Sequence, residues 1–513
     1  MKLQYNTGIR YKKRVLVFIP AFYAENLIGG VIQRIPASLL ERYEVDVLVI
    51  DDSSGDSTFA QGYAASKRED LPFSVRVLFN PSNQGYGGNQ KIGYRYAIDS
   101  GYDFVALVHG DGQYAPECLP ELLAPFEDAS VAAVFGSRMI SPGGARRGGM
   151  PLYKLLGNRT LTWIQNRLLG SDLTEFHTGY RIYSVRALAS IPFERNSNGF
   201  HFDTEIIIQL RIAKLEIREL PIPTHYGDEI CRVNGPKYAV SVILACLRAR
   251  LQELGIFYDR RYDCGRAPLA HYKPKLEYKS PHSVAYSMVP AGARVLDLGC
   301  AGGYMGQALK QGKSCFVTGV DAFEPDTVSL DEFYLRDLNQ GLTGIPVARH
   351  DFILFLDVIE HLASPERFLD QLYESLESNP NVQILMSTAN IGFFIQRLML
   401  LAGEFNYGKR GILDLTHTRL FTFRSFRNVV EQAGFDIHEM KAVPAPFPMA
   451  LGNNWFSRFL VAANAALTRL SKGLFAYQIF AVIRPRPSVA FLLGAATAES
   501  AKKVKAIETA VET

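Results

Sequence analysis

Four short segments in the first half of the chain hold the residue types that bind ligands. They are PAFYAEN (20–26), IDDSSGDST (50–58), NPSNQGYGGNQ (80–90) and HGDGQ (109–113). Each follows or ends an apolar run, and in open α/β sheets ligands bind beyond the carboxyl ends of the strands. The carboxylates and amides offer oxygen ligands, and the glycines let the backbone approach a bound group closely. Together the segments predict a ligand site.

Each segment also has a purely structural explanation when it is taken alone. Asp51, Asp52 and Asp56 suit a turn that leads into a helix cap, and Asp111 suits the cap of a helix a few residues later. The glycines of residues 80–90 are weak evidence by themselves. These alternatives do not explain why four such segments occur in order, each at the end of an expected strand.

The elements that must position these segments are apolar runs alternating with helical patterns. Continuous apolar runs are typical of strands buried on both faces, and the alternation predicts a doubly wound α/β fold around a parallel sheet. A second series of this kind begins at ARVLDLGC (293–300). The runs of the first series are residues 15–21, 45–52, 74–80, 104–111 and 131–138.

The two series predict two α/β domains joined by a linker. The segment between them is rich in proline, tyrosine and charge and lacks apolar periodicity, which is typical of a connecting loop. We expect a first domain at 1–258, a linker at 259–280, a second domain at 281–487 and a tail at 488–513.

The composition excludes some classes of protein. The 513 residues are 48% hydrophobic and 21% charged, and a formal net charge of +4 gives no support for nucleic-acid binding. The six cysteines form no C-x-x-C pair, which suits free thiols in a reducing compartment. No uninterrupted apolar run reaches the roughly 18 residues of a membrane span. We therefore expect a cytoplasmic protein without nucleic-acid partners.

The four segments resemble those of family 2 glycosyltransferases with the GT-A fold, and most of all the dolichyl- and polyprenyl-phosphate mannose or glucose synthases. The resemblance covers roughly residues 14–235 and implies a nucleotide-sugar donor, with Gly85 in the glycine loop beside it. Phenylalanine replaces the tyrosine that is usual in the first segment, and one extra residue precedes the glutamate. The positions that match the family's base and ribose contacts are Pro20, Phe22, Glu25 and Asp52.

The segment HGDGQ resembles the D-x-D-x-Q motif with which this family holds a divalent cation on the donor diphosphate. Asp111 and Gln113 match its later positions, so the resemblance implies that they bind Mg²⁺ or Mn²⁺. A hard cation with oxygen ligands neutralises the negative charge that develops on a diphosphate leaving group. His109 replaces the first aspartate and either supplies a contact or packs as a strand-end histidine.

Three further residues resemble family positions that touch the phosphates or the acceptor. Arg138, in FGSRMISPGG, is a candidate to bind the diphosphate or a lipid phosphate through its planar guanidinium. Asp203 and Glu205, in GFHFDTEIIIQL, either orient the acceptor or its cation or cap a helix.

Residues 144–170, GARRGGMPLYKLLGNRTLTWIQNRLLG, bear on the acceptor. Paired arginines precede an amphipathic pattern with Trp163, and the resembled synthases have this neighbourhood at a membrane face. An interfacial basic helix suits an anionic lipid acceptor, whereas an ordinary helix on the protein core explains the pattern nearly as well. We expect a polyprenyl-phosphate or saccharide acceptor, with peripheral contact at the inner face of the cell membrane in the first case.

A second candidate site lies in ARVLDLGCAGGYMGQAL (293–309), which reads as a strand, a glycine turn and a helix. A dinucleotide-binding fingerprint, G-x-G-x-x-G, fails because Tyr304 stands at its last glycine. With Asp297 on the strand before the turn, the segment instead resembles motif I of class I S-adenosylmethionine (SAM)-dependent methyltransferases. This resemblance covers roughly residues 280–485 and implies SAM as methyl donor.

The methyltransferase resemblance implies a role for several residues around this turn. The acidic strand residue Asp297 lies under the methionine moiety, Asp321 takes the ribose hydroxyls and Asp337 stands where the adenine contact often lies. The turn residues that approach SAM are Gly299, Ala301 and Gly303.

Acid–base residues also occur further along the second half. His417, in an insert after the fifth strand, is either a general base for a sugar hydroxyl or a loop histidine that contacts backbone. Asp357, Glu360 and His361 resemble a cation-binding arrangement of some O-methyltransferases, although such a histidine more often packs structurally.

The two halves together predict a bifunctional enzyme. It would transfer a sugar from a nucleotide-diphosphate sugar and a methyl group from SAM, to a sugar hydroxyl for example, in the assembly of a surface polysaccharide or glycolipid. Two alternatives stay open. The first half is a nucleotide-sugar-binding module with reduced catalysis, given His109 in the metal loop. Alternatively, the second half is a regulatory domain that binds SAM without transferring its methyl group.

Overall fold

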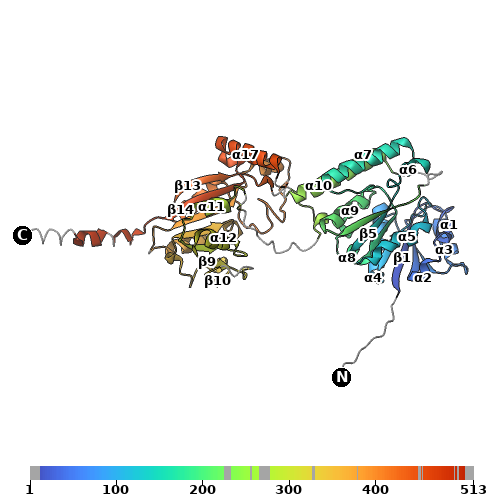
Figure 1. Cartoon of the computed structure of the whole chain (residues 1–513), viewed down its shortest axis with the longest axis horizontal. Helices are drawn as coiled ribbons and strands as arrows, with labels where there is room; N and C mark the ends of the chain where they lie inside the picture. Colours follow the sequence, from blue (N-terminus) through green and yellow to red (C-terminus); the bar gives the residue numbers. More distant parts are fainter. Residues whose placement is uncertain are drawn as a thin grey trace, which may run out of the picture. The chain divides into compact units, whose positions relative to one another are not determined.

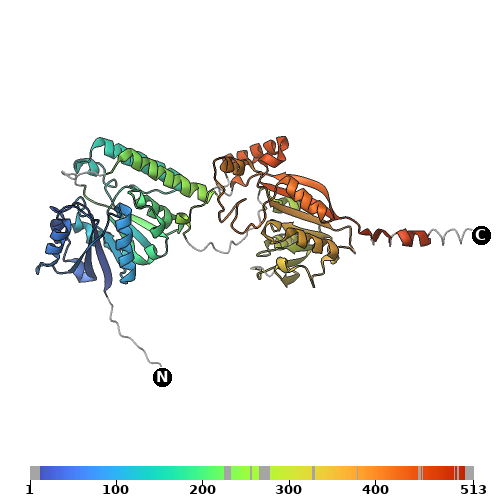
Figure 2. The same cartoon turned by 180° about the vertical axis from the view of Figure 1, so that it is seen from behind.

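The computed structural model describes residues 12–224, 233–254, 257–264, 276, 278–325, 330–377, 379–448, 452, 454–489, 491–493 and 496–502. The chain divides into two compact units, Met1–Arg266 and Ala267–Thr513. Each unit holds one seven-stranded sheet with helices on both faces (Figures 1 and 2). Most of the expected linker after residue 264 and much of the expected tail lie outside the described residues.

The first sheet is parallel except for β6, which is antiparallel to both of its neighbours. Its order reverses between β1 and β4, which is the place where ligands bind in open α/β sheets. The strand order is β3 (Ser74–Phe79), β2 (Tyr43–Asp51), β1 (Lys13–Ala21), β4 (Phe104–Leu107), β6 (Arg181–Ser184), β5 (Val131–Ser137) and β7 (Glu216–Pro221).

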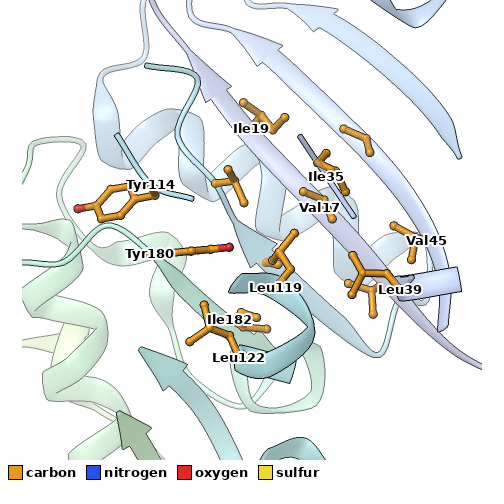
Figure 3. Packing of buried hydrophobic residues seen from close by; sticks show 14 of the residues in the cluster. Val17, Ile19, Ile35, Leu39, Val45, Tyr114, Leu119, Leu122, Tyr180 and Ile182 are labelled. Carbon is orange, nitrogen blue, oxygen red and sulfur yellow. The ribbon is translucent and has the colours of Figure 1, made fainter. Parts of the chain in front are cut away.

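Alternate residues of β1 enter two cores, one on each face of the sheet. Val17 and Ile19 pack toward Leu119 and Leu122 of one face (Figure 3), whereas Phe18 packs against the other. The first face is covered by α1 (Ile28–Gln33), α2 (Leu39–Arg42), α3 (Thr58–Ser66) and α5 (Leu119–Leu123). The second is covered by α4 (Tyr86–Asp99), α8 (Val185–Ala189), α9 (Phe202–Ile212) and α10 (Gly235–Glu253).

Two more helices follow β5. They are α6 (Gly144–Arg147) and α7 (Leu152–Leu169), in agreement with the helical pattern expected at 144–170. Helix α7 lies beside α10 in both whole-chain views (Figures 1 and 2). The short 3-10 helices of this unit are η1 (Pro116–Cys118), η2 (Ala124–Glu127), η3 (Phe193–Arg195) and η4 (Arg260–Tyr262).

The second sheet reverses its order between β8 and β11. Its one antiparallel strand is β14, which enters between β12 and β13 although it comes last in the sequence. The strand order is β10 (Glu332–Leu335), β9 (Phe316–Asp321), β8 (Arg294–Leu298), β11 (Phe352–Leu356), β12 (Gln383–Ala389), β14 (Gln478–Pro485) and β13 (Phe435–Val443).

Helices cover both faces of this sheet as well. One face carries α11 (Pro281–Met288) and α12 (Tyr304–Lys313), and the other carries α13 (Pro365–Ser375) and α15 (Phe423–Gln432). Three helices lie near its margin: α14 (Phe394–Leu401), α17 (Trp455–Leu470) and α18 (Lys472–Phe475). The 3-10 helices are η5 (Leu338–Gln340), η6 (Val347–Arg349) and η7 (Ile359–His361).

The expected fold class, two α/β domains with helices on both faces of a sheet, is confirmed. The sheets are mixed rather than wholly parallel, because β6 and β14 run against their neighbours. A short buried strand has the same apolar run in either direction, so the sequence pattern does not reveal its orientation. No helix within the described residues is long and apolar enough to cross a membrane.

Candidate active sites

The first candidate site forms where the ends of β1, β2 and β4 meet. The Asp52 N–H donates to the carbonyl of Ala21 at 2.9 Å, and the Gly110 N–H donates to that of Pro20 at 3.4 Å. These bonds bring the segments 20–26, 50–58 and 109–113 to one edge of the sheet. The expectation that they form one site agrees with this geometry.

Asp52 is buried and closes the glycine loop. Its carboxylate accepts hydrogen bonds from Asn80 Nδ2 at 2.8 Å, Gln84 N at 2.8 Å and Gly85 N at 3.0 Å. Gly85 has φ +79, and a Cβ there would lie 2.7 Å from the Asn198 carbonyl oxygen, so glycine is required. Asp52 therefore shapes the loop, and its contact with a ribose stays a prediction.

The structure also contains the turn leading into a helix that was the alternative explanation for Asp51 and Asp56. Asp51 Oδ1 accepts from the backbone N–H and the hydroxyl of Ser54, while Asp56 Oδ1 accepts from those of Thr58, the first residue of α3. Asp51 Oδ2 is buried without a hydrogen-bond partner among the described residues. The same segment thus forms a turn and leaves one buried carboxylate oxygen unsatisfied within the described residues.

An aromatic pair stands at the end of β1. Phe22 and Tyr23 are exposed, their ring centroids are 4.6 Å apart, and Tyr23 adopts φ +53 while its N–H donates to Ser54 Oγ. Glu25 Oε2 accepts from Ser57 N at 2.9 Å. Sequence reasoning missed Tyr23, although the extra residue before Glu25 pointed to it. The pair offers flat faces on which a nucleotide base can stack.

Asp111 and His109 have different surroundings although they are two residues apart. Asp111 is exposed, and its Oδ1 accepts only the local N–H of Gln113, at 3.1 Å. The His109 ring packs against Tyr114, with centroids 5.1 Å apart, and a Cβ on Gly179 would lie 2.5 Å from its Cε1. Burial lowers the pKa of His109, so the neutral ring is favoured. The geometry favours packing over metal binding for His109.

Asp111 and Gln113 fit a cation that also binds the phosphates of a donor. An exposed carboxylate and a side-chain amide at the sheet edge supply hard oxygen ligands. In the part of the chain that the structure describes, no group of three or more His, Cys, Asp or Glu residues could hold a metal ion. The protein by itself therefore offers an incomplete set of ligands, which donor phosphates and waters would complete.

Asp203 lies in a buried network beneath this loop. Tyr86 Oη donates to its Oδ2 at 2.9 Å and lies 3.3 Å from His109 Nε2, from which it can accept. Gln90 Nε2 donates to its Oδ1, and the fully buried Arg181 forms an ion pair with it at 3.7 Å. The role of Asp203 toward an acceptor stays a prediction, whereas its link through Tyr86 to His109 of the 109–113 loop is a feature of the fold.

Glu205 uses both carboxylate oxygens within the protein. Its Oε1 lies 2.6 Å from Arg261 Nη1 of η4, and its Oε2 accepts from Ser197 N at 2.7 Å. The side chain is fully buried in the first turn of α9. These contacts hold η4 and the loop before α9 together, and any contact with an acceptor stays a prediction.

Arg138 forms a buried ion pair with Glu175. Its backbone N–H and guanidinium donate to that carboxylate, and Nη2 also donates to the carbonyl of His177. Asn158 of α7 donates to Glu175 Oε1 at 2.8 Å. Burial alone would raise the pKa of Glu175, but Arg138 outweighs it and lowers this pKa. An anionic ligand would have to share Arg138 with Glu175.

Replacing Glu175 by glutamine should destabilise the first unit by about 3–5 kcal/mol, because it leaves the buried Arg138 charge without its partner. Urea unfolding followed by circular dichroism checks this. The control is Glu117→Gln, which removes an exposed pair with Arg34 and should change stability by no more than about 1 kcal/mol. Equal effects of the two substitutions would contradict the role given to this pair.

The second candidate site is the turn between β8 and α12. Gly299 and Gly303 have φ +76 and +77, and Ala301 between them has φ +47, which is unusual for a residue with a Cβ. A Cβ on Gly299 would lie 2.5 Å from Val358 Cγ2. Within the turn the N–H groups of Gly299 and Cys300 donate to the Val320 carbonyl, and that of Ala301 donates to Asp321 Oδ2, so these bonds fix the turn at the end of the sheet before α12 begins.

Asp297 is the most perturbed acid of this site. Burial, together with the nearby Asp321, raises the pKa of Asp297 to about 7, and its side chain is 4% exposed. Its Oδ2 has no hydrogen-bond partner among the described residues. A buried carboxyl with one unsatisfied oxygen beside a glycine turn suits a ligand that brings a cationic N–H donor.

Asp321 and Asp337 lie near this turn at the ends of β9 and β10. The two oxygens of Asp321 accept the N–H groups of Ala301, at 2.8 Å, and Phe323, at 3.1 Å. The Arg336 N–H donates to the Asp321 carbonyl, which brings Asp337 to the same edge. Phe323, which sequence reasoning missed, is 71% exposed and offers a ring beside these acids.

His417 and His361 lie close together. Their ring centroids are 4.8 Å apart. His361 follows the end of β11, whereas Asp321 ends β9, on the other side of β8. His417 Nδ1 must donate to the Ile412 carbonyl, 2.8 Å away, which leaves Nε2 as the acceptor of a neutral ring. Burial lowers the pKa of His417, with a further contribution from His361, so the neutral ring is favoured. This is the state that a general base needs.

Asp357 is occupied within the protein, whereas Glu360 accepts the Ala389 N–H through Oε1 and its Oε2 has no hydrogen-bond partner among the described residues. Glu360 is buried, and burial and Asp357 raise its pKa to about 8. The Asp357 oxygens accept from Ser387 Oγ at 2.6 Å and Gln478 Nε2 at 2.7 Å. Within the described residues these side chains form no metal-binding group, so the cation alternative for Asp357, Glu360 and His361 finds no support.

Comparisons with known families match each unit separately. The model of glycosyl transferase family 2 matches residues 16–191, and a methyltransferase domain model matches residues 272–440. An undecaprenyl-phosphate mannosyltransferase of Micrococcus luteus is 31% identical over 210 residues, which are 41% of this chain and 82% of that protein.

Two further relatives cover the same part of the chain. A UDP-N-acetylglucosamine–dolichyl-phosphate N-acetylglucosaminyltransferase of Methanococcus voltae is 27% identical over 226 residues, 42% of this chain and 87% of that protein. The crystal structure of Mycobacterium tuberculosis glucosyl-3-phosphoglycerate synthase is 19% identical, with a TM-score of 0.35, and covers 46% of this chain and 80% of that one.

Proposed function

Because this chain belongs to the family 2 glycosyltransferases and also carries a methyltransferase domain, we propose that it transfers a sugar to a polyprenyl phosphate and a methyl group to a saccharide hydroxyl. The donors are a nucleotide-diphosphate sugar and SAM. The observation that carries the lipid acceptor is the character of α7, which buries polar side chains and exposes apolar ones.

Helix α7 does not behave as an ordinary core helix. It buries Thr162 and Gln165 together with Leu169 at its end, and it exposes Tyr153, Leu156 and Trp163 at 73%, 56% and 66%. It contains no acidic residue, and α6 before it carries Arg146 and Arg147. The neighbouring α10 adds the exposed apolar residues Val240, Leu244 and Leu247. An apolar, basic surface of this kind suits a membrane that holds an anionic lipid.

The chemistry of sugar transfer follows from the first site. A phosphate oxygen of the acceptor is already a strong nucleophile, so attack on the anomeric carbon needs little base catalysis. The new bond joins that oxygen to the sugar, and the bond from the sugar to the donor diphosphate breaks. Asp111 and Gln113 would hold Mg²⁺ or Mn²⁺, which neutralises charge on the departing diphosphate. Phe22 and Tyr23 would stack on the base.

The second site supports methyl transfer to oxygen. SAM supplies a methyl group on a sulfonium, with Asp297 facing its amino group and Asp321 its ribose. Direct displacement forms a carbon–oxygen bond as the carbon–sulfur bond breaks, so the protein mainly aligns the two reactants. Nε2 of His417 would accept the hydroxyl proton.

The experiment for this function uses the whole chain with Mn²⁺, a short polyprenyl phosphate and a panel of nucleotide sugars. Mass spectrometry of the lipid, with and without SAM, should reveal a glycosylated product, and a methylated one if the two steps share it. The matched acceptor is the same polyprenol without phosphate, which should stay unmodified. Donor hydrolysis or saccharide products without any lipid product would indicate that the acceptor is not a polyprenyl phosphate. The absence of any donor turnover would indicate that the first unit is a nucleotide-sugar-binding module.

Replacing His417 by asparagine should slow methyl transfer by about 10²–10⁴-fold while SAM affinity is unchanged. For the native chain, activity should rise with pH through the pKa of His417, below the ordinary 6.5, and be level above it, because only the neutral ring accepts a proton. Initial rates at saturating SAM against pH check both statements. Unaltered turnover in the variant would show that His417 is only a loop residue bonded to Ile412.

A further inference from the structure

Helix α17 in the second unit turns its polar residues inward. Ser457, Asn464 and Thr468 are buried on one face, and the Asn464 amide accepts from Ala445 N at 2.9 Å and donates to the Phe475 carbonyl at 3.0 Å. Apolar side chains occupy the opposite face. This is the reverse of an ordinary surface helix, whose apolar stripe faces the core.

The outward face of α17 is large and aromatic. Trp455 is 79% exposed and Leu470 80%, and Phe456, Phe459 and Leu467 are exposed beside them. Nothing in the described part of the chain covers these side chains. Helix α17 lies at the margin of its unit, next to β13 (Figure 1). Exposed apolar patches of this size mark interaction surfaces.

Helix α14 repeats the reversed pattern and adjoins α17 through α18. It buries Gln396 and exposes Leu398, Leu400 and Leu401. The rings of Phe394 in α14 and Phe475 in α18 have centroids 6.0 Å apart, and α18 follows α17 directly. The α14–α17 surface is defined by Leu398, Leu400, Leu401, Trp455, Phe456, Phe459, Leu467 and Leu470.

The charged residues around this surface are mainly basic. Helices α14, α17 and α18 contain Arg397, Arg458, Arg469 and Lys472 and no acidic residue. The loop after α14 adds one acid, Glu404, together with two more basic residues. Basic residues around exposed tryptophan and phenylalanine match the headgroup region of an anionic membrane, where aromatic side chains and lysine or arginine gather.

We propose that the α14–α17 surface lies on an anionic lipid bilayer, with its apolar side chains at the headgroup boundary and its basic residues against lipid phosphates. A second copy of the chain fits less well, because two such surfaces would bring like charges together. The 16 residues of α17 span about 24 Å, less than the roughly 30 Å of a hydrocarbon core, so the helix lies on the membrane.

This inference stands apart from the lipid acceptor proposed for the glycosyltransferase. It concerns the methyltransferase unit, and it holds whether or not sugar goes to a polyprenyl phosphate. If both proposals hold, the methyl acceptor is lipid-linked, because the methyltransferase works at the membrane surface. That last statement rests on the proposed function.

The two tryptophans of the chain make the two surfaces separately measurable. Trp163 lies on α7 and Trp455 on α17, and the sequence has no others. In the full chain with Trp163→Phe, all tryptophan emission comes from α17. Vesicles of phosphatidylcholine with phosphatidylglycerol should shift this emission to the blue, and brominated lipids should quench it. Vesicles of phosphatidylcholine alone should cause a much smaller change.

A paired substitution tests the apolar contribution. Phe459→Glu with Leu470→Glu should weaken binding to anionic vesicles at least about tenfold, because both side chains leave the lipid boundary. Both positions are exposed, so circular dichroism should be unchanged. The matched control is Leu335→Glu, which adds a charge at a 60% exposed leucine on the edge strand β10 and should leave vesicle binding unaltered.

The other outcomes of these experiments distinguish the membrane proposal, association with a second copy and the acceptor proposal. If Trp455 emission stays that of a water-exposed ring with vesicles present, the α14–α17 surface does not bind lipid, whatever Trp163 does in the Trp455→Phe chain. If the emission instead shifts with protein concentration without lipid, the surface binds a second copy. A Trp455 response with no glycosylated lipid in the transfer assay would overturn the acceptor proposal alone.

Discussion

Replacing Asp111 by asparagine is expected to lower the rate of sugar transfer about a hundredfold to a thousandfold. A bound cation contributes several kcal/mol to stabilising a leaving diphosphate, and each 1.36 kcal/mol is tenfold in rate. Asp111 is the carboxylate that the metal loop presents to solvent. Its amide replacement keeps the size of the side chain but loses the charge that attracts the cation.

This loss should be specific to the first reaction. The carboxylate accepts one hydrogen bond from Gln113 within its own loop, so the substitution breaks no buried contact and the fold should persist. The Mn²⁺ concentration for half-maximal activity should rise in parallel, and methyl transfer by the same preparation serves as the internal control. Glu117→Gln, further along the same loop, should keep full activity. An unaltered Mn²⁺ requirement in the Asp111 variant would remove Asp111 from the metal site.

Replacing Asp297 by asparagine is expected to weaken SAM binding about tenfold to a hundredfold. A hydrogen bond to a charged group contributes about 1.5–3 kcal/mol, and in the proposed complex Oδ2 of Asp297, which has no partner among the described residues, would accept one from the SAM amino group. Isothermal titration calorimetry measures this directly. Asp331→Asn, an acid that holds the start of β9 and Lys310, is a control that should keep native affinity.

The affinity for SAM should also depend on pH in the native chain. Since the pKa of Asp297 is about 7, only about one tenth of the free protein carries the ionised carboxylate at pH 6. Affinity should therefore be about tenfold below its limit at pH 6 and level above pH 8, and binding at pH 7 should release about half a proton per SAM on average. Calorimetry in buffers of different ionisation enthalpy counts that proton. Asp297→Asn should abolish both effects, and a flat native profile would contradict the assignment.

Rising pH changes the stability of the fold and the affinity for SAM in opposite directions through Asp297. The folded pKa of Asp297 lies above the ordinary 3.8, so the folded chain retains a proton that the unfolded chain has lost between these values. The contribution of this group to stability is therefore full at low pH and declines as pH rises toward 7. SAM binding, which uses the charged form, offsets that decline.

Strand ends and turns were the most predictable part of both sites. Apolar runs located the strands, and the carboxyl ends of parallel strands must share an edge, so the sequence predicted that Asp52 and Asp111 meet there. The direction of β6 was not predictable, because a strand of four residues, three of them buried, has no pattern that distinguishes the two orientations. The order of β13 and β14 within the second sheet could not be predicted either, because the apolar pattern of a strand does not reveal its neighbours.

The hydrogen-bond partners of individual carboxylates could not be predicted from the sequence. Asp52 and Glu205 match ligand-binding positions, yet the structure directs their oxygens to the glycine loop and to Arg261. The pairing of Arg138 with Glu175 joins residues 37 positions apart and could not be read from either segment. Which acid faces a ligand depends on side-chain direction and burial, and these follow from packing between distant segments.

The contact between His109 and Gly179 has an evolutionary consequence. The imidazole fills the space that any side chain on residue 179 would need, with Cε1 only 2.5 Å from a Cβ built there. Residue 109 can shrink to an aspartate only by opening a void, and residue 179 can gain a side chain only after residue 109 has shrunk. We therefore expect the two positions to vary together. Exchange of the 109–113 loop between relatives should succeed only when the matching residue of the segment before β6 is exchanged with it.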